Sequence, residues 1–186
     1  MRYSREHSEK TRRAILDAAA RTFRERGAAG AGVDAVASSA SVTSGAIYRQ
    51  FRSKNDLFAA VVGEGMDRLV AGLSTMRDTH GSQWREHLVK HYVGASHVAS
   101  AGSGCILPSL AIDVGRGDED CRTAFDDGLE RAVGVLAAPG QGEELSRDRA
   151  LLLLASMLGS VILARATGDE DIRQALERAL LAGDPT

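Results

Sequence analysis

Apolar residues recur at helical spacing along most of this chain, and this pattern constrains its fold more than any other feature. No stretch alternates apolar and polar residues as a half-buried strand would, and proline occurs only at positions 108, 139 and 185. With 186 residues, 44% of them hydrophobic, the chain is long enough to bury a substantial core. We therefore predict an all-α protein of about nine helices.

Capping and stop signals set the bounds of these helices. Gly27 is available as a stop for the first helix, Ser53 and Asp56 form a capping pair, and Asp169 caps the last helix. The expected helices cover residues 9–26, 33–39, 44–51, 54–77, 83–99, a short segment from Pro108, a segment from the acidic residues 118–120 to 137, and residues 147–167 and 170–182.

Charge is distributed unevenly along the chain, although the net charge is only −2. Through Asp56 there are 11 Lys and Arg against 6 Asp and Glu, a net charge of +5, and the remainder carries 12 against 19, a net charge of −7. This asymmetry indicates that only the N-terminal part contacts a polyanion. We expect a head, residues 1–53, and a body, residues 54–186.

Cysteine content and hydropathy bear on the compartment. Cys105 and Cys121 are too few for a secreted disulfide scaffold and lack the spacing of a zinc or redox motif. The N-terminal residues lack the apolar segment of a signal peptide, and the longest apolar run, residues 150–164, is shorter than the roughly 20 residues of a membrane span. We expect a cytoplasmic protein with no membrane partner, in which this run forms a buried helix.

Residues 33–51 predict two short helices joined by a tight turn, the pattern of a helix-turn-helix. Val36, Ala37, Ala40, Val42 and Ile47 are expected to face inward. The residues expected to face outward are Thr43, Ser44, Gly45, Ala46, Tyr48 and Arg49.

The segment VDAVASSASVTSGAIYRQFRSKNDL, residues 33–57, closely resembles the N-terminal signature of the TetR family of transcriptional regulators. Its most specific part is the Gly-x-Ile-Tyr-x-x-Phe-x-x-Lys pattern from Gly45 to Lys54. Ser41 departs from the family, which commonly has glycine there, as do Ala31 and Gly32, where Thr and Ser are common. The resemblance implies a repressor without catalytic activity or cofactor, which binds a palindromic operator as a homodimer and is released by a small-molecule effector.

Residue chemistry assigns roles within the predicted recognition helix. The Thr43 hydroxyl and the neighbouring backbone N–H groups suit a phosphate, and Gly45 lets the helix end approach the DNA closely. Ser44, Ala46 and Arg49 are candidates for contacts to base edges. The predicted DNA-binding residues are Thr43, Ser44, Gly45, Ala46, Tyr48, Arg49 and Lys54, with Tyr48 and Lys54 holding the DNA backbone as in the resembled family.

The last two expected helices are apolar on more than one face, so each must be covered on several sides. In the resembled family this pair packs against its twofold mate, and a palindromic operator also requires a twofold dimer. The predicted interface residues are Leu151, Leu154, Leu158, Val161, Ile162, Ile172, Leu176, Ala179 and Leu180.

The middle helices of the resembled family enclose an effector pocket, and the few aromatic residues of this body favour a modest, mostly aliphatic one. The candidate ligand-binding residues are Met66, Trp84, His87, His91, Tyr92, Cys105, Phe125 and Arg131.

Two alternatives involve the same candidates. Cys105 could act as a thiol sensor with Cys121 as its resolving partner, although no cation lies beside Cys105 in sequence to lower its pKa. His87 and His91 have the i, i+4 spacing of metal ligands or of a helical-bundle enzyme site, but the second position of the motif is Leu88 rather than glutamate. We expect no metal, because two histidines without a third ligand seldom form a site.

Overall fold

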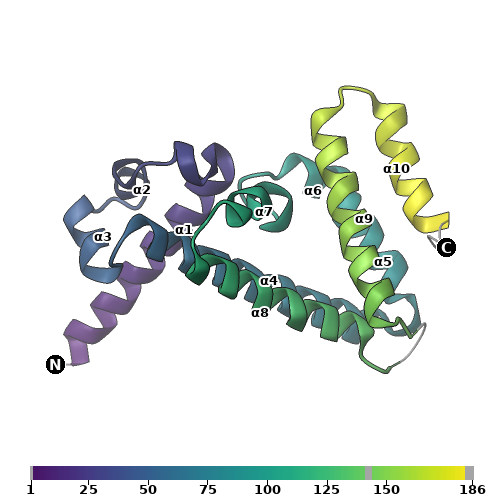
Figure 1. The fold of residues 1–186 in the computed structure, drawn as a ribbon, viewed down its shortest axis with the longest axis horizontal. Helices are drawn as coiled ribbons and strands as arrows, with labels where there is room; N and C mark the ends of the chain where they lie inside the picture. The colour runs from purple at the N-terminus through teal and green to yellow at the C-terminus, as the bar shows by residue number, and fades with distance from the viewer. Residues whose placement is uncertain (1, 141–143, 183–186) are drawn as a thin grey trace.

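The computed structural model describes residues 2–140 and 144–182, and within them the protein is entirely helical, as predicted (Figure 1). The ten α-helices of this part are close to the nine expected, and one 3-10 turn, Gly81–Gln83, accompanies them. The α-helices are α1 (Arg2–Gly30), α2 (Val33–Ser39), α3 (Ser44–Gln50), α4 (Lys54–His80), α5 (Trp84–Val93), α6 (Ala95–Ala99), α7 (Leu107–Gly115), α8 (Glu119–Ala137), α9 (Arg147–Ala166) and α10 (Glu170–Ala182).

The head is a three-helix unit at one end of the molecule (Figure 1). Helix α1 begins earlier than the sequence predicted and kinks at Gly27, whose φ of 72° and ψ of 161° interrupt the helical backbone. Phe23 of α1 packs edge-on against Phe58 of α4, with ring centroids 5.2 Å apart, so α4 is anchored to the head core. In the turn between α2 and α3, Ser41 adopts a φ of 55°, the left-handed conformation that glycine adopts without strain.

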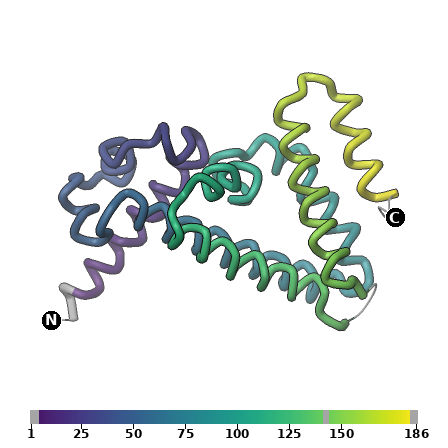
Figure 2. The backbone as a smooth tube through the Cα atoms, in the orientation of Figure 1, coloured from purple at the N-terminus to yellow at the C-terminus, as the bar shows by residue number. Residues whose placement is uncertain are grey.

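Helix α4 leaves the head and runs side by side with α8 along one edge of the molecule (Figure 2). Its start is capped as predicted, since the Asp56 N–H donates to the Ser53 hydroxyl at 3.0 Å. At 27 residues α4 is about 40 Å long. The two helices approach closely where Gly128 faces Met66, because a Cβ at position 128 would lie 2.3 Å from the Met66 Cβ. The α4–α8 pair is therefore the mechanical link between the head and the far end of the body.

The expected helix over residues 83–99 is divided in the structure. Gly94 has an extended backbone, with φ −63° and ψ 153°, and this ends α5 and starts α6 in a new direction. A Cβ at position 94 would lie only 2.6 Å from the Lys90 carbonyl oxygen, so the break requires glycine. The change of direction lets α6 and the following residues, 100–106, form a roof above α4.

Helix α9 packs against α5, α7 and α8, and its neighbour α10 folds back along it (Figure 1). By length and composition alone α9 could cross a membrane, and 39% of its most apolar window is buried within the protein. Leu153, Met157 and Val161 line the side that faces the core. One side of α9 therefore packs in the core of the helical bundle.

Candidate functional site

The N-terminal end of α3 is the best-defined surface of the head. Thr43 caps the helix, as predicted, because its Oγ1 accepts from the Ala46 N–H at 3.2 Å. The Ser44 hydroxyl donates to the Asp34 carboxylate of α2 at 2.6 Å, which links the two short helices at the surface. Gly45 is exposed, and a Cβ there would meet nothing closer than the Thr43 Oγ1 at 3.9 Å.

The predicted DNA-binding residues differ in how far they are exposed to solvent. Tyr48 is 56% exposed, Arg49 is exposed, and Lys54 is half-buried at the start of α4. The prediction that Ala46 faces outward toward a base edge is wrong, since Ala46 is only 8% exposed. Successive residues of an α-helix differ in direction by about 100°, so Ala46 points away from the exposed side on which Gly45 lies.

Arg12 of α1 supports α3, a role that the sequence analysis missed. Its guanidinium donates to the Gln50 carbonyl oxygen at 2.9 Å and lies 4.2 Å from the centroid of the Phe51 ring. Because both partners lie at the C-terminal end of α3, Arg12 fixes this helix to α1. No sequence motif marks this contact, which spans 38 positions along the chain.

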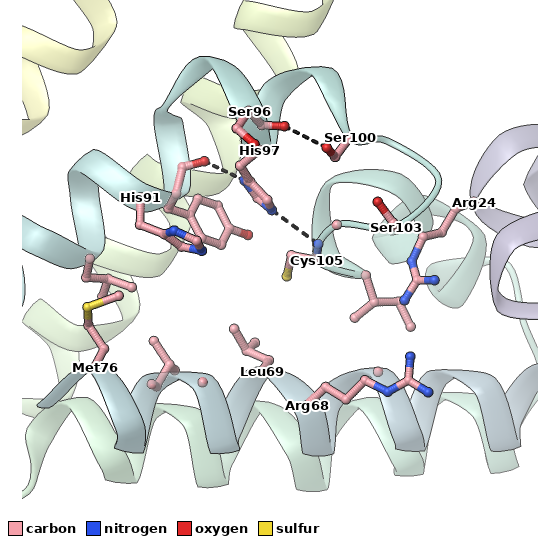
Figure 3. Close-up of a pocket in the computed structure, with 17 residues that line it drawn as sticks. Arg24, Arg68, Leu69, Met76, His91, Ser96, His97, Ser100, Ser103 and Cys105 are labelled. Carbon is pink, nitrogen blue, oxygen red and sulfur yellow. Dashed lines mark hydrogen bonds between the residues drawn. The ribbon is translucent and has the colours of Figure 1, made fainter. Parts of the chain in front are cut away.

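A cavity of about 490 Å³ lies between the head and the far end of the body (Figure 3). Its lining comes from α1, α4, α5, α6 and residues 100–106. Of the eight candidate ligand-binding residues, His91, Tyr92 and Cys105 line it.

The other five candidates lie elsewhere. Met66 is fully buried beneath α8, and Trp84 is buried in the core of the far end of the body. His87 stacks on His80 with ring centroids 3.8 Å apart. Phe125 is partly buried against the core of α4 and α8, and the exposed Arg131 pairs with an aspartate of α4 at 2.8 Å.

The roof of the cavity is held by hydrogen bonds to His97 (Figure 3). The His97 Nε2 accepts from the Cys105 N–H at 3.2 Å, so the other ring nitrogen, Nδ1, carries the proton and donates to the Tyr92 carbonyl oxygen at 2.5 Å. Arg165 of α9 reinforces the roof by donating to the carbonyl oxygens of Val98 at 3.0 Å and His97 at 3.2 Å. The roof thus depends on a neutral histidine and on α9.

Burial shifts the pKa values of several side chains around the cavity. Burial lowers the pKa of Arg24, and the neighbouring Arg68 lowers this pKa further. Burial lowers the pKa of His97 and raises the pKa of the Cys105 thiol. Burial also raises the pKa of Tyr92. Arg24, Arg68 and His97 were not among the sequence candidates, because residues from three separate helices meet here only in the folded chain.

The predicted dimer-interface residues also differ in exposure. Leu154 and Val161 are buried inside the protomer. Ile162, Ile172 and Ala179 are exposed. The remaining four, Leu151, Leu158, Leu176 and Leu180, are half-buried.

Two further exposed leucines of α9, Leu152 and Leu163, extend the apolar surface and were missed by the sequence analysis. In the described residues, no group of three His, Cys, Asp or Glu side chains is placed to hold a metal ion.

Comparison with known proteins places these features in context. Residues 15–61 match the model of the bacterial regulatory proteins of the tetR family. The HTH-type transcriptional regulator AcrR of Shigella flexneri is 38% identical over 60 residues, which cover 32% of this chain and 28% of that protein. The HTH-type transcriptional activator FasR of Mycolicibacterium smegmatis is 30% identical over 132 residues, 66% of this chain and 60% of that protein. The chain therefore spans less than two thirds of the length of either relative.

Solved structures share the whole fold at low sequence identity. The reduced form of NemR from E. coli superimposes with a TM-score of 0.75 and 21% identity, covering 92% of this chain and 95% of NemR. A TetR-family regulator from Agrobacterium tumefaciens superimposes with a TM-score of 0.77 and 17% identity, covering 94% and 97% of the two chains. The likeness thus includes the body as well as the head.

Proposed function

The chain belongs to the TetR family of transcriptional regulators, and we propose that it binds a twofold-symmetric DNA operator as a homodimer and is released by a small-molecule effector. Regulators of this family are DNA-binding proteins of the cytoplasm rather than enzymes, and we assign this chain to the same compartment. In this proposal the head binds DNA, the surface of α9 and α10 forms the dimer interface, and the cavity binds the effector.

The exposed N-terminal end of α3 is the observation that supports DNA binding most strongly. Gly45 has an ordinary helical backbone and open space around its Cβ position, so nothing inside the protein requires glycine there. Glycine at position 45 instead suits a close approach of the DNA backbone to this end of α3. Tyr48 and Arg49 flank this position with an aromatic hydroxyl and a guanidinium, groups that contact phosphate and guanine respectively.

An exposed apolar surface on the last two helices supports the homodimer. Leu152, Ile162 and Leu163 of α9 and Ile172 of α10 are each at least 41% exposed. Gly159 lies within this surface and has open space beyond it, so a second helix can approach closely there. Several exposed apolar side chains on one pair of helices are typical of an interface, and a twofold dimer presents two recognition helices to a palindrome.

The position of the cavity supports release by an effector. It lies beside α4, the helix that leads directly from the head, and also receives a residue of α1. An effector that binds one arrangement of α4 more tightly than the DNA-bound one shifts the population toward release. Such coupling is typically about 1–3 kcal/mol.

Selection of bound sequences from random duplex DNA at a defined salt concentration tests this proposal. We expect enrichment of a palindrome whose half-sites lie about one helical turn apart. The Arg49→Ala variant should lose binding to the selected DNA, whereas Arg131→Ala, which removes an arginine from the surface of α8, should retain it. Absence of an enriched palindrome would refute operator binding by a dimer.

The two alternatives receive less support from the site. Cys105 lines the cavity, but its raised pKa keeps the thiol protonated at neutral pH, which disfavours oxidant sensing. His91 lines the cavity while His87 stacks on His80 outside it, so the pair does not converge on one point. Loss of oxidant-induced release in Cys105→Ala, or a turnover abolished in His91→Ala, would favour the respective alternative.

A further inference from the structure

Arg24 is an arginine without a partner at the edge of the cavity. Within the described part of the chain it forms no hydrogen bond or ion pair, and its Nε is buried without a hydrogen-bond acceptor. A buried polar group without a partner is costly, and for a charged group the cost is larger. The fold therefore keeps a guanidinium at this place without satisfying it internally.

The surroundings of Arg24 leave its charge uncompensated. Arg68, which lines the same side of the cavity, already pairs with Asp17 at 3.0 Å and Glu64 at 3.2 Å (Figure 3). No aspartate or glutamate is among the described residues that line the cavity. This side thus has an available guanidinium and no internal anion to bind it.

The far part of the cavity has an apolar floor, with His91 of α5 above it (Figure 3). Leu69, Leu73 and Met76 lie at successive turns along α4, and Leu88 of α5 joins them. From Leu69 to Met76 the helix rises about 10 Å, and Figure 3 shows Met76 at the far end from Arg24. The cavity therefore has a guanidinium at one end and an apolar floor along α4 that leads toward the other end.

We propose that the effector is an organic monocarboxylate with an apolar chain, whose carboxylate is bound by Arg24 and whose chain lies along Leu69, Leu73 and Met76. The fork of a guanidinium matches a carboxylate in a bidentate geometry. The apolar chain removes the leucine and methionine side chains from water. This inference rests on the proposed function, in which the cavity is the effector site.

Binding of the carboxylate ties the head to the body. Arg24 belongs to α1, three residues before the kink at Gly27, whereas the chain of the ligand contacts α4 and α5. Just after the kink, the Ala28 N–H donates to Asp113 of α7 at 3.1 Å, a second link between head and body. A ligand held by Arg24 therefore bridges the α1–α4 unit to α5, and by biasing how the head sits against the body it alters the spacing of the two recognition helices.

Calorimetric titration of the full chain with octanoate and with 1-octanol tests the proposal, because the two probes share a chain and differ in charge. We expect octanoate to bind more tightly than octanol. Arg24→Gln should weaken octanoate binding about ten- to a hundredfold, the effect of losing a charge-assisted hydrogen bond, and leave octanol binding within about twofold. The matched control is Arg21→Gln, an exposed arginine one turn earlier on α1 that does not line the cavity, and it should bind both probes as the unaltered chain does.

Three results would overturn the inference: no binding of octanoate, equal affinity for the two probes, or unchanged octanoate affinity in Arg24→Gln. Anisotropy of labelled operator DNA, measured without ligand, separates these results from failure of the proposed function. If the operator binds and octanoate does not, only the inference about the ligand fails. If octanoate binding depends on Arg24 and no operator is found, the carboxylate site stands and the regulatory role fails.

Discussion

The close contact between α4 and α8 gives a quantitative test of how this protein is held together. An alanine at position 128 would place its Cβ 2.3 Å from the Met66 Cβ and 2.8 Å from the Met66 Cγ, whereas carbon atoms pack optimally about 3.5–4.0 Å apart. The nearest clashing atom is a Cβ, which is fixed to the backbone of α4. The two helices must therefore separate by more than an ångström, and a rotamer change cannot absorb the methyl group.

The expected cost follows from two opposing effects. Overpacking a core typically costs about 1–3 kcal/mol, and a contact between rigid atoms belongs at the upper end of that range. Replacing glycine within a helix returns about 0.5–1 kcal/mol. We therefore expect Gly128→Ala to lower the free energy of unfolding by about 2 kcal/mol.

Gly134→Ala is the matched control, because Gly134 lies on the same helix with nothing within 4 Å of its Cβ position. It should raise the free energy of unfolding by up to about 1 kcal/mol. Urea unfolding, followed by circular dichroism at one protomer concentration, should separate the two variants by about 3 kcal/mol. Equal stability of the two variants would show that the α4–α8 contact does not restrict the volume at position 128, and would refute the reasoning.

Three further predictions concern the head and the cavity. Gly45→Ala should keep or slightly raise the melting temperature, because the added Cβ meets no atom within 3.8 Å. The same variant should bind the operator more weakly in anisotropy assays. Unchanged operator affinity would contradict a close approach of DNA to this position. Ser41→Gly should stabilise the protein by roughly 0.5–1 kcal/mol in urea unfolding, because it relieves a left-handed backbone with φ of 55°; a loss of stability would contradict this. Because burial lowers the pKa of His97 below its ordinary 6.5, the folded protein binds fewer protons there than the unfolded chain. The free energy of unfolding should therefore fall as the pH decreases below about 6.5, by at most about 1.4 kcal/mol per pH unit from this residue, and unfolding of His97→Gln at several pH values should lack that contribution.

The helices and the exposed end of α3 were accessible from sequence because local chemistry decides them. Thr43 and Ser53 cap their helices in the structure as their hydroxyls predicted, and Gly27 interrupts α1 where a stop was expected. Helical periodicity also placed Tyr48 and Arg49 outward. Ala46 was misplaced, since a seven-residue helix that packs on two neighbours buries more of its circumference than a single outward face suggests.

The cavity required the tertiary structure, because its residues come from helices that are distant along the chain. Met66 and Trp84 have the residue types of a binding pocket and are packed in the core instead, since only the folded arrangement decides which apolar faces close on each other. The sequence by itself determined an all-helical chain with a basic N-terminal unit, because capping, periodicity and charge act over a few residues. Only the fold decided that Arg24 of the head meets Leu69 and Met76 of the body across one cavity, because that meeting depends on how α1, α4 and the roof pack together.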